Sequence, residues 1–176
     1  SPDNRVSMSY IDSISRGRHG LVYCLTNEDD YFTLRKGVLV EFVDHTKTSI
    51  DGITYIYSDP SEDGMVYIGT EGSDLHYGNP KRDLEGVVTY DVSPLVNVSN
   101  ISKIGDRVWI CARNGIGVID AGDFYCYEGL ALDSSVNHVM EDYEGNLWFT
   151  SSRQGVMKLT PNRFQDVFER YELPER

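Results

Sequence analysis

Six basic and amide side chains directly follow short strands led by an aromatic residue, and together they could bind an anion. They are Arg35, Lys36, Arg113, Asn114, Arg153 and Gln154. A guanidinium group offers several N–H donors in one plane, which suit a carboxylate or phosphate group. We therefore expect these six residues to line a ligand-binding surface.

A second set of side chains is acidic and lies in the turns before the same strands. Its members are Glu28, Asp29, Asp30, Glu62, Asp63, Asp106, Glu141, Asp142 and Glu144. Carboxylates are calcium ligands, but the D-x-[DN]-x-[DN]-G spacing of a calcium loop is missing. None of the four histidines, His19, His45, His76 and His138, has the H-x-x-x-H spacing of a zinc site. We therefore expect solvated hairpin turns, with no metal and no cofactor.

Motifs for covalent catalysis or nucleotide binding are missing from the sequence. There is no G-x-S-x-G, no G-x-x-x-x-G-K-[ST] and no G-x-G-x-x-G. The sequence also gives no reason to place two carboxylates across one cleft, as a glycosidase needs. The three cysteines, Cys24, Cys111 and Cys126, allow one bridge, but their wide spacing favours free buried thiols. We therefore expect a protein that is not an enzyme.

Length and charge narrow the choice of partners. The 176 residues are the size of a single domain, 1–176, and carry a net charge of −12. Such an acidic chain is unsuited to nucleic acid or to an anionic membrane surface, which both need basic residues. The longest unbroken apolar run, Leu21 to Leu25, is far below the roughly 20 residues of a membrane-spanning helix. The expected partner is a small molecule, such as an anion, or another protein.

The elements that must position these residues are strands. Ten short runs rich in β-branched and aromatic residues are separated by turns rich in Gly, Asp, Asn and Ser. All six prolines fall outside these runs, as the interior of a sheet requires. The pattern predicts an all-β fold.

An internal repeat selects the architecture. Four aromatic anchors, Tyr31, Tyr67, Trp109 and Trp148, are spaced 36, 42 and 39 residues apart, each after a polar turn. Four-stranded units of about 40–50 residues are typical of β-propeller blades. We expect about four antiparallel blades, roughly 20–52, 53–97, 98–134 and 135–176, with each anchor in a second strand, packed between blades. The chain would be part of a larger propeller or a small four-bladed one.

The two sets of turns should lie on opposite faces of such a disc. Turns between first and second strands open on one face, and turns between second and third strands open on the other. The acidic set is assigned to the first kind of turn and the basic and amide set to the second. We therefore expect an acidic face and an opposite, partly basic face that binds the ligand.

The last repeat resembles the two-component regulator propeller repeat. It contains Gly129-Leu130, then Glu141-Asp142, then the hairpin Gly145-Asn146-Leu147-Trp148, and finally Gly155-Val156. The third repeat matches this pattern in part, and the first two match only in outline. The resemblance implies the extracytoplasmic sensor part of a bacterial signalling protein, of the histidine kinase or cyclic-di-nucleotide synthase type.

The expected function is thus a non-catalytic sensor module that binds a ligand. The alternative is a structural module that assembles, for example as a homodimer, through the open edges of its terminal blades. A third and weaker hypothesis is a lyase or a glycan-active propeller, which share the fold.

Overall fold

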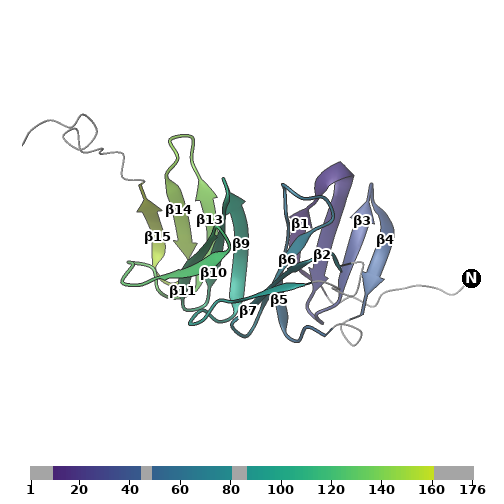
Figure 1. Cartoon of the computed structure of the whole chain (residues 1–176), viewed down its shortest axis with the longest axis horizontal. Helices are drawn as coiled ribbons and strands as arrows, with labels where there is room; N and C mark the ends of the chain where they lie inside the picture. Colours follow the sequence, from purple (N-terminus) through teal and green to yellow (C-terminus); the bar gives the residue numbers. More distant parts are fainter. Residues whose placement is uncertain (1–9, 45–48, 81–86, 161–176) are drawn as a thin grey trace, which may run out of the picture.

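The structure is a computed structural model, and it describes residues 10–44, 49–80 and 87–160. The regular structure of this part is β, apart from the three-residue helix η1 (Arg18–Gly20). The described part contains fifteen strands in four antiparallel sheets, each in simple sequence order. Figure 1 shows how these sheets follow one another along the chain. Among these residues there is no helix with the length and apolar character needed to span a membrane. The prediction of an all-β fold is confirmed.

Each sheet is one blade, and its strands are numbered from the inner strand outward. Blade 1 contains β1 (Ile11–Arg16), β2 (Leu21–Thr26), β3 (Tyr31–Arg35) and β4 (Val38–Val43). Blade 2 contains β5 (Ile53–Ser58), β6 (Val66–Thr70), β7 (Asp74–Gly78) and β8 (Val88–Asp91). Blade 3 contains β9 (Val98–Ile104), β10 (Arg107–Ala112), β11 (Gly115–Asp120) and β12 (Asp123–Tyr127). Blade 4 contains β13 (Val136–Glu141), β14 (Leu147–Ser151) and β15 (Gly155–Leu159), and the residues after 160 lie outside the described part.

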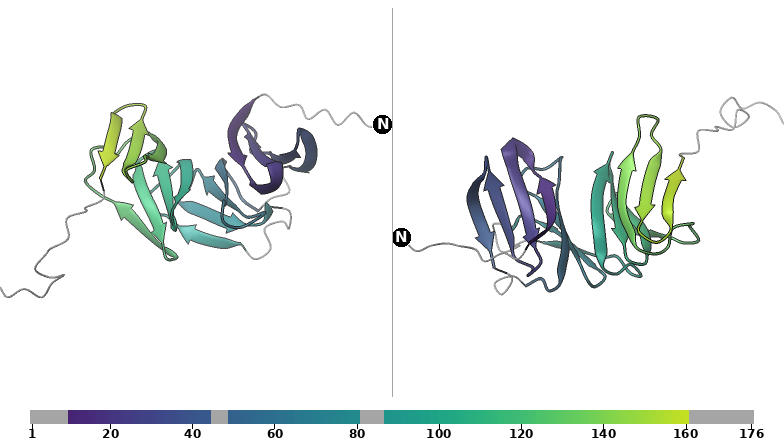
Figure 2. Two further views of the ribbon diagram at one scale, coloured as in Figure 1. Left: turned by 90° about the horizontal axis from the view of Figure 1, so that it is seen from above. Right: turned by 180° about the vertical axis from the view of Figure 1, so that it is seen from behind.

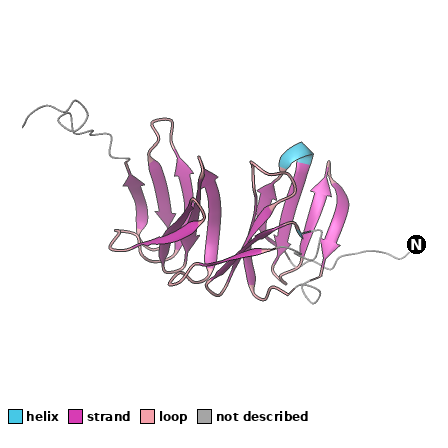
Figure 3. Cartoon of the chain, viewed as in Figure 1, coloured by secondary structure: helices cyan, strands magenta, loops and turns pink. Residues whose placement is uncertain are grey.

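The blades stack face to face in an open arc, with blades 1 and 4 at its ends (Figure 2). The inner strands lie side by side, because β1 contacts β5, β5 contacts β9 and β9 contacts β13. Figure 3 shows the helix η1 and the hairpin of β13 and β14 along the same edge of the row of blades, the upper edge in this view. We call this edge the upper end of the blades, and it carries the turns between first and second strands. The lower end carries the turns between second and third strands. The arc is a partial β-propeller.

The first blade differs from the expected assignment by one strand. Residues 11–16 form its inner strand, so the blade begins at Ile11 and not near residue 20. Tyr31 therefore lies in the third strand, and Tyr23 takes the second-strand place of Tyr67 and Trp109. The inner strand was missed because β1, with the sequence IDSISR, has few apolar residues. The match between Val22-Tyr23 and Val66-Tyr67 was the signal that could have identified it.

Apolar side chains between neighbouring blades form three separate cores. Tyr23 packs in the core between blades 1 and 2, Tyr67 in that between blades 2 and 3, and Trp109 in that between blades 3 and 4. Tyr31 also packs between the first two blades. Trp148 is only half-buried, since it faces outward from the last blade and lies under the ammonium group of Lys158. Burial between blades is thus confirmed for three of the four predicted anchors.

Backbone hydrogen bonds at the lower end connect blades 2, 3 and 4. The residue before each inner strand (Gly52, Asn97 or Ser135) has a left-handed conformation, with φ of 63°, 56° and 50°. Its carbonyl accepts from the amide of a residue just after the second strand of its own blade. The amides of Asn97 and Ser135 also donate to the equivalent residue of the preceding blade. The bonds are Glu71 N to Gly52 O (2.8 Å), Asn97 N to Glu71 O (2.9 Å), Arg113 N to Asn97 O (3.1 Å), Ser135 N to Arg113 O (2.7 Å) and Ser152 N to Ser135 O (3.3 Å).

A buried ion pair joins blades 2 and 3 at the upper end. Lys103 Nζ lies 3.0 Å from both carboxylate oxygens of Asp59, whose side chain is only 2% exposed. Burial alone would raise the pKa of Asp59, but hydrogen bonds from the Ser61 amide, Lys103 and Tyr77 outweigh it and lower the pKa. The ionised carboxylate therefore stabilises the fold above the unfolded pKa of about 3.9. That contribution is lost as the pH falls through the lowered, folded-state pKa.

Substitution of Lys103 by Met should destabilise the protein strongly, because it leaves the Asp59 charge buried without its partner. We expect a loss of about 3–5 kcal/mol in the free energy of unfolding, measured by urea denaturation. Arg107→Met is the matched control, since it breaks an exposed ion pair with Asp120. That variant should lose less than about 1 kcal/mol. Equal losses in the two variants would contradict a special role for the buried pair.

Candidate functional site

The structure divides the six predicted ligand-binding residues between the upper and lower ends of the blades. Arg113 and Asn114 lie in the turn between β10 and β11, and Arg153 and Gln154 lie in the turn between β14 and β15, all at the lower end. Arg35 is the last residue of the third strand of blade 1 and Lys36 follows it, so both lie at the upper end. The six residues do not form one surface, because one strand in the first blade was assigned wrongly.

The two faces also differ from the expected separation of charge. Glu28, Asp29 and Asp30 lie in the turn between β2 and β3, at the same lower end as Arg113 and Arg153. Both ends therefore carry acidic and basic side chains. The expectation of one acidic face and one partly basic face is wrong, for the same reason.

The two amides of the predicted set hold the links between blades in place. Asn114 accepts a hydrogen bond from the Val96 amide (2.8 Å) and donates to the Pro94 carbonyl (2.7 Å). Gln154 accepts from the amides of Asp133 (3.1 Å) and Ser134 (3.0 Å), and donates to the Asp133 carboxylate (2.8 Å). These amides are therefore occupied within the fold.

The two arginines beside these amides remain available. Arg113 and Arg153 are exposed, and their guanidinium groups form no hydrogen bond or ion pair with the described residues. A ligand carboxylate or phosphate could pair with either of them. Ligand binding by the predicted residues at the lower end stays a prediction, reduced here to these two side chains.

The acidic turn of blade 4 uses its carboxylate internally. Asp142 accepts hydrogen bonds from the amides of Glu144 and Asn146 (both 2.9 Å) and from Trp148 Nε1 (2.8 Å). The Trp148 hydrogen bond is the largest cause of the lowered pKa of Asp142. No cluster of three or more His, Cys, Asp or Glu side chains suited to a metal ion occurs in the described ranges, which leave out His45.

The three cysteines are free thiols in the structure. Cys24 and Cys111 are buried, and Cys126 is half-buried, so burial is complete for two of the three. Burial raises the pKa of Cys111 to about 12. A thiol with that pKa stays protonated at neutral pH and is unsuited to act as a nucleophile.

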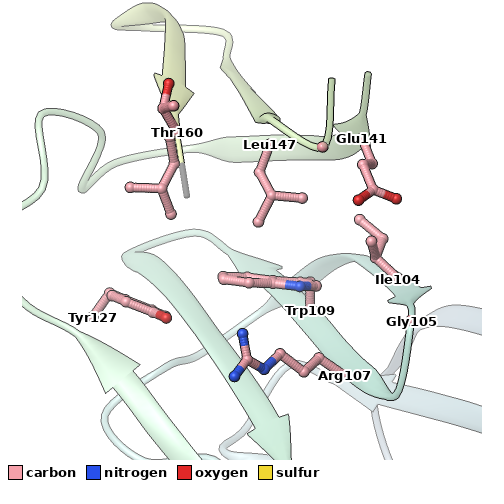
Figure 4. Close-up of a pocket in the computed structure, with 10 residues that line it drawn as sticks. Ile104, Gly105, Arg107, Trp109, Tyr127, Glu141, Leu147 and Thr160 are labelled. Carbon is pink, nitrogen blue, oxygen red and sulfur yellow. The ribbon is translucent and has the colours of Figure 1, made fainter. Parts of the chain in front are cut away.

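A cavity of about 540 Å³ lies between blades 3 and 4, toward the upper end. Figure 4 shows its two walls, with Trp109, Tyr127 and Arg107 on blade 3 and Leu147 and Glu141 on blade 4. The other lining residues are Ile104, Gly105, Gly145, Leu159 and Thr160. A volume of this size suits a small organic molecule.

Aromatic rings form the blade 3 wall of the cavity. Trp109 stacks beside Tyr127, with ring centroids 5.6 Å apart and planes inclined by 17°, and it meets the edge of Phe149 at 5.6 Å. Arg107 Nε donates to Asp120 at 2.7 Å, which balances the arginine charge. The sequence assigned Trp109 to packing alone, so the cavity was missed.

Comparison with solved structures identifies the architecture. The extracellular domain of a protein described as a hybrid two-component system of B. thetaiotaomicron matches with a TM-score of 0.63 and 23% identity, over 89% of this chain and 24% of that one. The extracellular domain of a protein described as a one-component system of B. thetaiotaomicron matches with a TM-score of 0.60 and 12% identity, over 87% of this chain and 24% of that one. The structure of YCF48 bound to D1 peptide matches with a TM-score of 0.68 and 11% identity, over 89% of this chain and 52% of that one.

The β-propeller domain of Myceliophteria thermophila Cps50 (Swd1) matches with a TM-score of 0.63 and 12% identity, over 89% of this chain and 54% of that one, and this similarity shows the β-propeller fold. The chain spans about a quarter of the length of each of the two extracellular domains. No protein-family model matches the sequence, and no curated protein matches it.

Two neighbouring residues at the lower end should differ in their effect on stability. Gln154→Ala removes three hydrogen bonds to the link before β13, so we expect a loss of about 1–2 kcal/mol in the free energy of unfolding. Arg153→Ala removes an exposed side chain and should change that free energy by less than about 0.5 kcal/mol. Chemical denaturation of both variants tests this, and an unchanged Gln154→Ala variant would contradict the structural role.

Proposed function

We propose that this chain is a sensor module of a bacterial signalling protein, which binds a ligand outside the cytoplasm without transforming it. The observation that carries the proposal is the match of 89% of the chain to the extracellular domain of a hybrid two-component system. The resemblance of the last repeat to the two-component regulator propeller repeat points the same way. The output would be a histidine kinase or a cyclic-di-nucleotide synthase elsewhere in the parent protein.

The cavity between blades 3 and 4 is the best-formed candidate for the ligand site. It is concave and combines an aromatic wall with a few polar groups, as small-molecule sites usually do. The two free arginines at the lower end lie instead on exposed turns. We therefore assign the ligand to the cavity and keep the lower end as the alternative location.

Binding in this cavity would be sensed through the position of blade 4. The ligand would touch β10 and β12 on one wall and β14 and β15 on the other. A ligand that fits only one spacing of the two blades would favour that spacing, in proportion to its difference in affinity. The fourth blade would transmit this change to the rest of the parent protein.

Thermal shift measurements test the site. We would screen amino acids, dipeptides, monosaccharides and disaccharides, and expect at least one to raise the melting temperature of the wild type. Leu147→Trp should abolish that rise, because the larger side chain fills the cavity. The control variant Arg113→Glu/Arg153→Glu should keep it. The opposite result for the two variants would place the ligand at the lower end.

Mass spectrometry of the bound compound then tests the non-catalytic role. The compound should be recovered unchanged after long incubation with the protein. A product whose amount grows with time and with protein concentration would contradict the sensor proposal and favour a lyase or a glycan-active propeller.

Exposed apolar side chains on the two edge strands of blade 1 favour a second candidate function, assembly with another copy of the chain. Ile14, Cys24, Phe32 and Phe42 form one row across the four strands of this face. Ile14 is 61% exposed and Phe42 is 38% exposed, although such residues usually pack between blades. Cys24 and Phe32, between them, are buried, so the exposed apolar surface lies at the two edges of this face, where a second copy could pack.

Sedimentation velocity tests this alternative. If the chain assembles through blade 1, the wild type should be a dimer, and Ile14→Glu/Phe42→Glu should be a monomer with an unchanged circular dichroism spectrum. Tyr143→Glu is the matched control, since Tyr143 is exposed in a turn of blade 4. A monomeric wild type at high protein concentration would contradict assembly through this face.

A further inference from the structure

The indole N–H of Trp109, in the wall of the cavity, has no hydrogen-bond partner among the described residues. Trp109 is only 3% exposed, and within the described residues its indole Nε1 donates to no acceptor. This nitrogen is not among the buried unpaired atoms of the described residues, so it opens onto the cavity, where water or a ligand can accept its hydrogen bond. An unpaired donor beside a cavity therefore points to an acceptor on a ligand.

The neighbouring blades show what is missing in blade 3. In blade 4, Trp148 pairs in register with Met140, and Asp142 two residues further on accepts its indole hydrogen bond. In blade 3, Trp109 pairs in register with Ser102, and the residue two positions further on is Ile104. An apolar side chain thus replaces the acceptor.

Blade 2 keeps an acid at this position. Tyr67 pairs in register with Tyr57, and the residue two positions further on is Asp59. The change to isoleucine is therefore confined to blade 3 among blades 2, 3 and 4. Ile104 and Trp109 both line the cavity, so the unpaired donor and the lost acceptor belong to one site.

The other polar groups of the cavity determine which ligand fits. Glu141 has no hydrogen bond or ion pair within the described residues, and Figure 4 shows its carboxylate beside Ile104, toward which the indole nitrogen of Trp109 lies. The charge of Arg107 is balanced by Asp120. The unbalanced charge at the site is therefore negative and disfavours an anion.

We propose that the cavity binds an uncharged amide attached to an apolar group. The amide carbonyl accepts from Trp109 Nε1, the amide N–H donates to the Glu141 carboxylate, and the apolar group packs between the Trp109 ring and Leu147. An amide places an acceptor and a donor side by side, as these two protein groups require. This inference rests on the proposed role of the cavity as the ligand site.

The two tryptophans of the chain provide a direct test by nuclear magnetic resonance. The protein labelled with ¹⁵N should give two indole N–H signals, and Trp109→Phe identifies the signal of Trp109. We would titrate N-acetyl-L-leucinamide, which has two amides and an isobutyl group but no charge. We expect a saturable shift of the Trp109 signal, while the Trp148 signal, held by Asp142, stays in place.

Two controls separate the parts of the inference. 4-Methylpentanoate has the same apolar group with a carboxylate in place of the amide, and it should shift the Trp109 signal at least fivefold more weakly at equal concentration. Glu141→Leu should weaken N-acetyl-L-leucinamide binding at least fivefold, since Glu141 is exposed and its loss should leave the fold intact. A tripeptide, N-acetyl-Ala-Leu-Ala-amide, tests the source of the amide, because tighter binding than N-acetyl-L-leucinamide would identify a peptide.

The negative outcomes are distinct. A Trp109 signal that does not move with N-acetyl-L-leucinamide, or that moves equally with 4-methylpentanoate, overturns the amide assignment. If the amide fails but another compound of the thermal shift panel moves the Trp109 signal, the cavity remains the ligand site. If no compound moves it, the amide assignment and the proposed site both fail.

Discussion

The chain of backbone hydrogen bonds at the lower end determines how the blades sit against each other. The links into blades 2, 3 and 4 each enter the inner strand through one residue of left-handed conformation, whose carbonyl is paired with a second-strand turn. In Asn97 and Ser135 the amide is paired with such a turn as well. Backbone groups away from water must find partners, so this geometry leaves little freedom in the angle between blades 2, 3 and 4. Asn114 and Gln154 reinforce it by binding the incoming links.

Side chains fill the space that this backbone arrangement leaves between the sheets. The glycine at position 69 shows how closely the blades approach, since a Cβ there would lie 2.6 Å from the Val98 side chain. Tyr23, Tyr67 and Trp109 each face the following blade and pack in the core between the two blades. At the upper end the turns differ in length from blade to blade. The turn of blade 3, Gly105-Asp106, is short, and the cavity lies beside it.

A repeat architecture offers a simple route to a binding site. The blades share one backbone plan, so a substitution in one of them changes the chemistry between two sheets without changing the fold. Ile104 has this effect: it stands in blade 3 where blades 2 and 4 have an aspartate, and it leaves the Trp109 N–H unpaired next to a cavity. A sensor built in this way would bind its ligand at a joint between blades, where a small change in spacing can be transmitted.

The sequence alone was sufficient for the fold class, because alternation of short strands and turns is a local property and the aromatic anchors recur at a nearly constant period. It also predicted the burial of Tyr67 and Trp109. It failed at β1, whose polar residues hide an inner strand, and that one-strand error moved Arg35 and Lys36 to the wrong end. Only the tertiary structure revealed the cavity. Its walls come from strands far apart in the chain, and whether a donor such as Trp109 Nε1 is paired depends on neighbours that the sequence does not place.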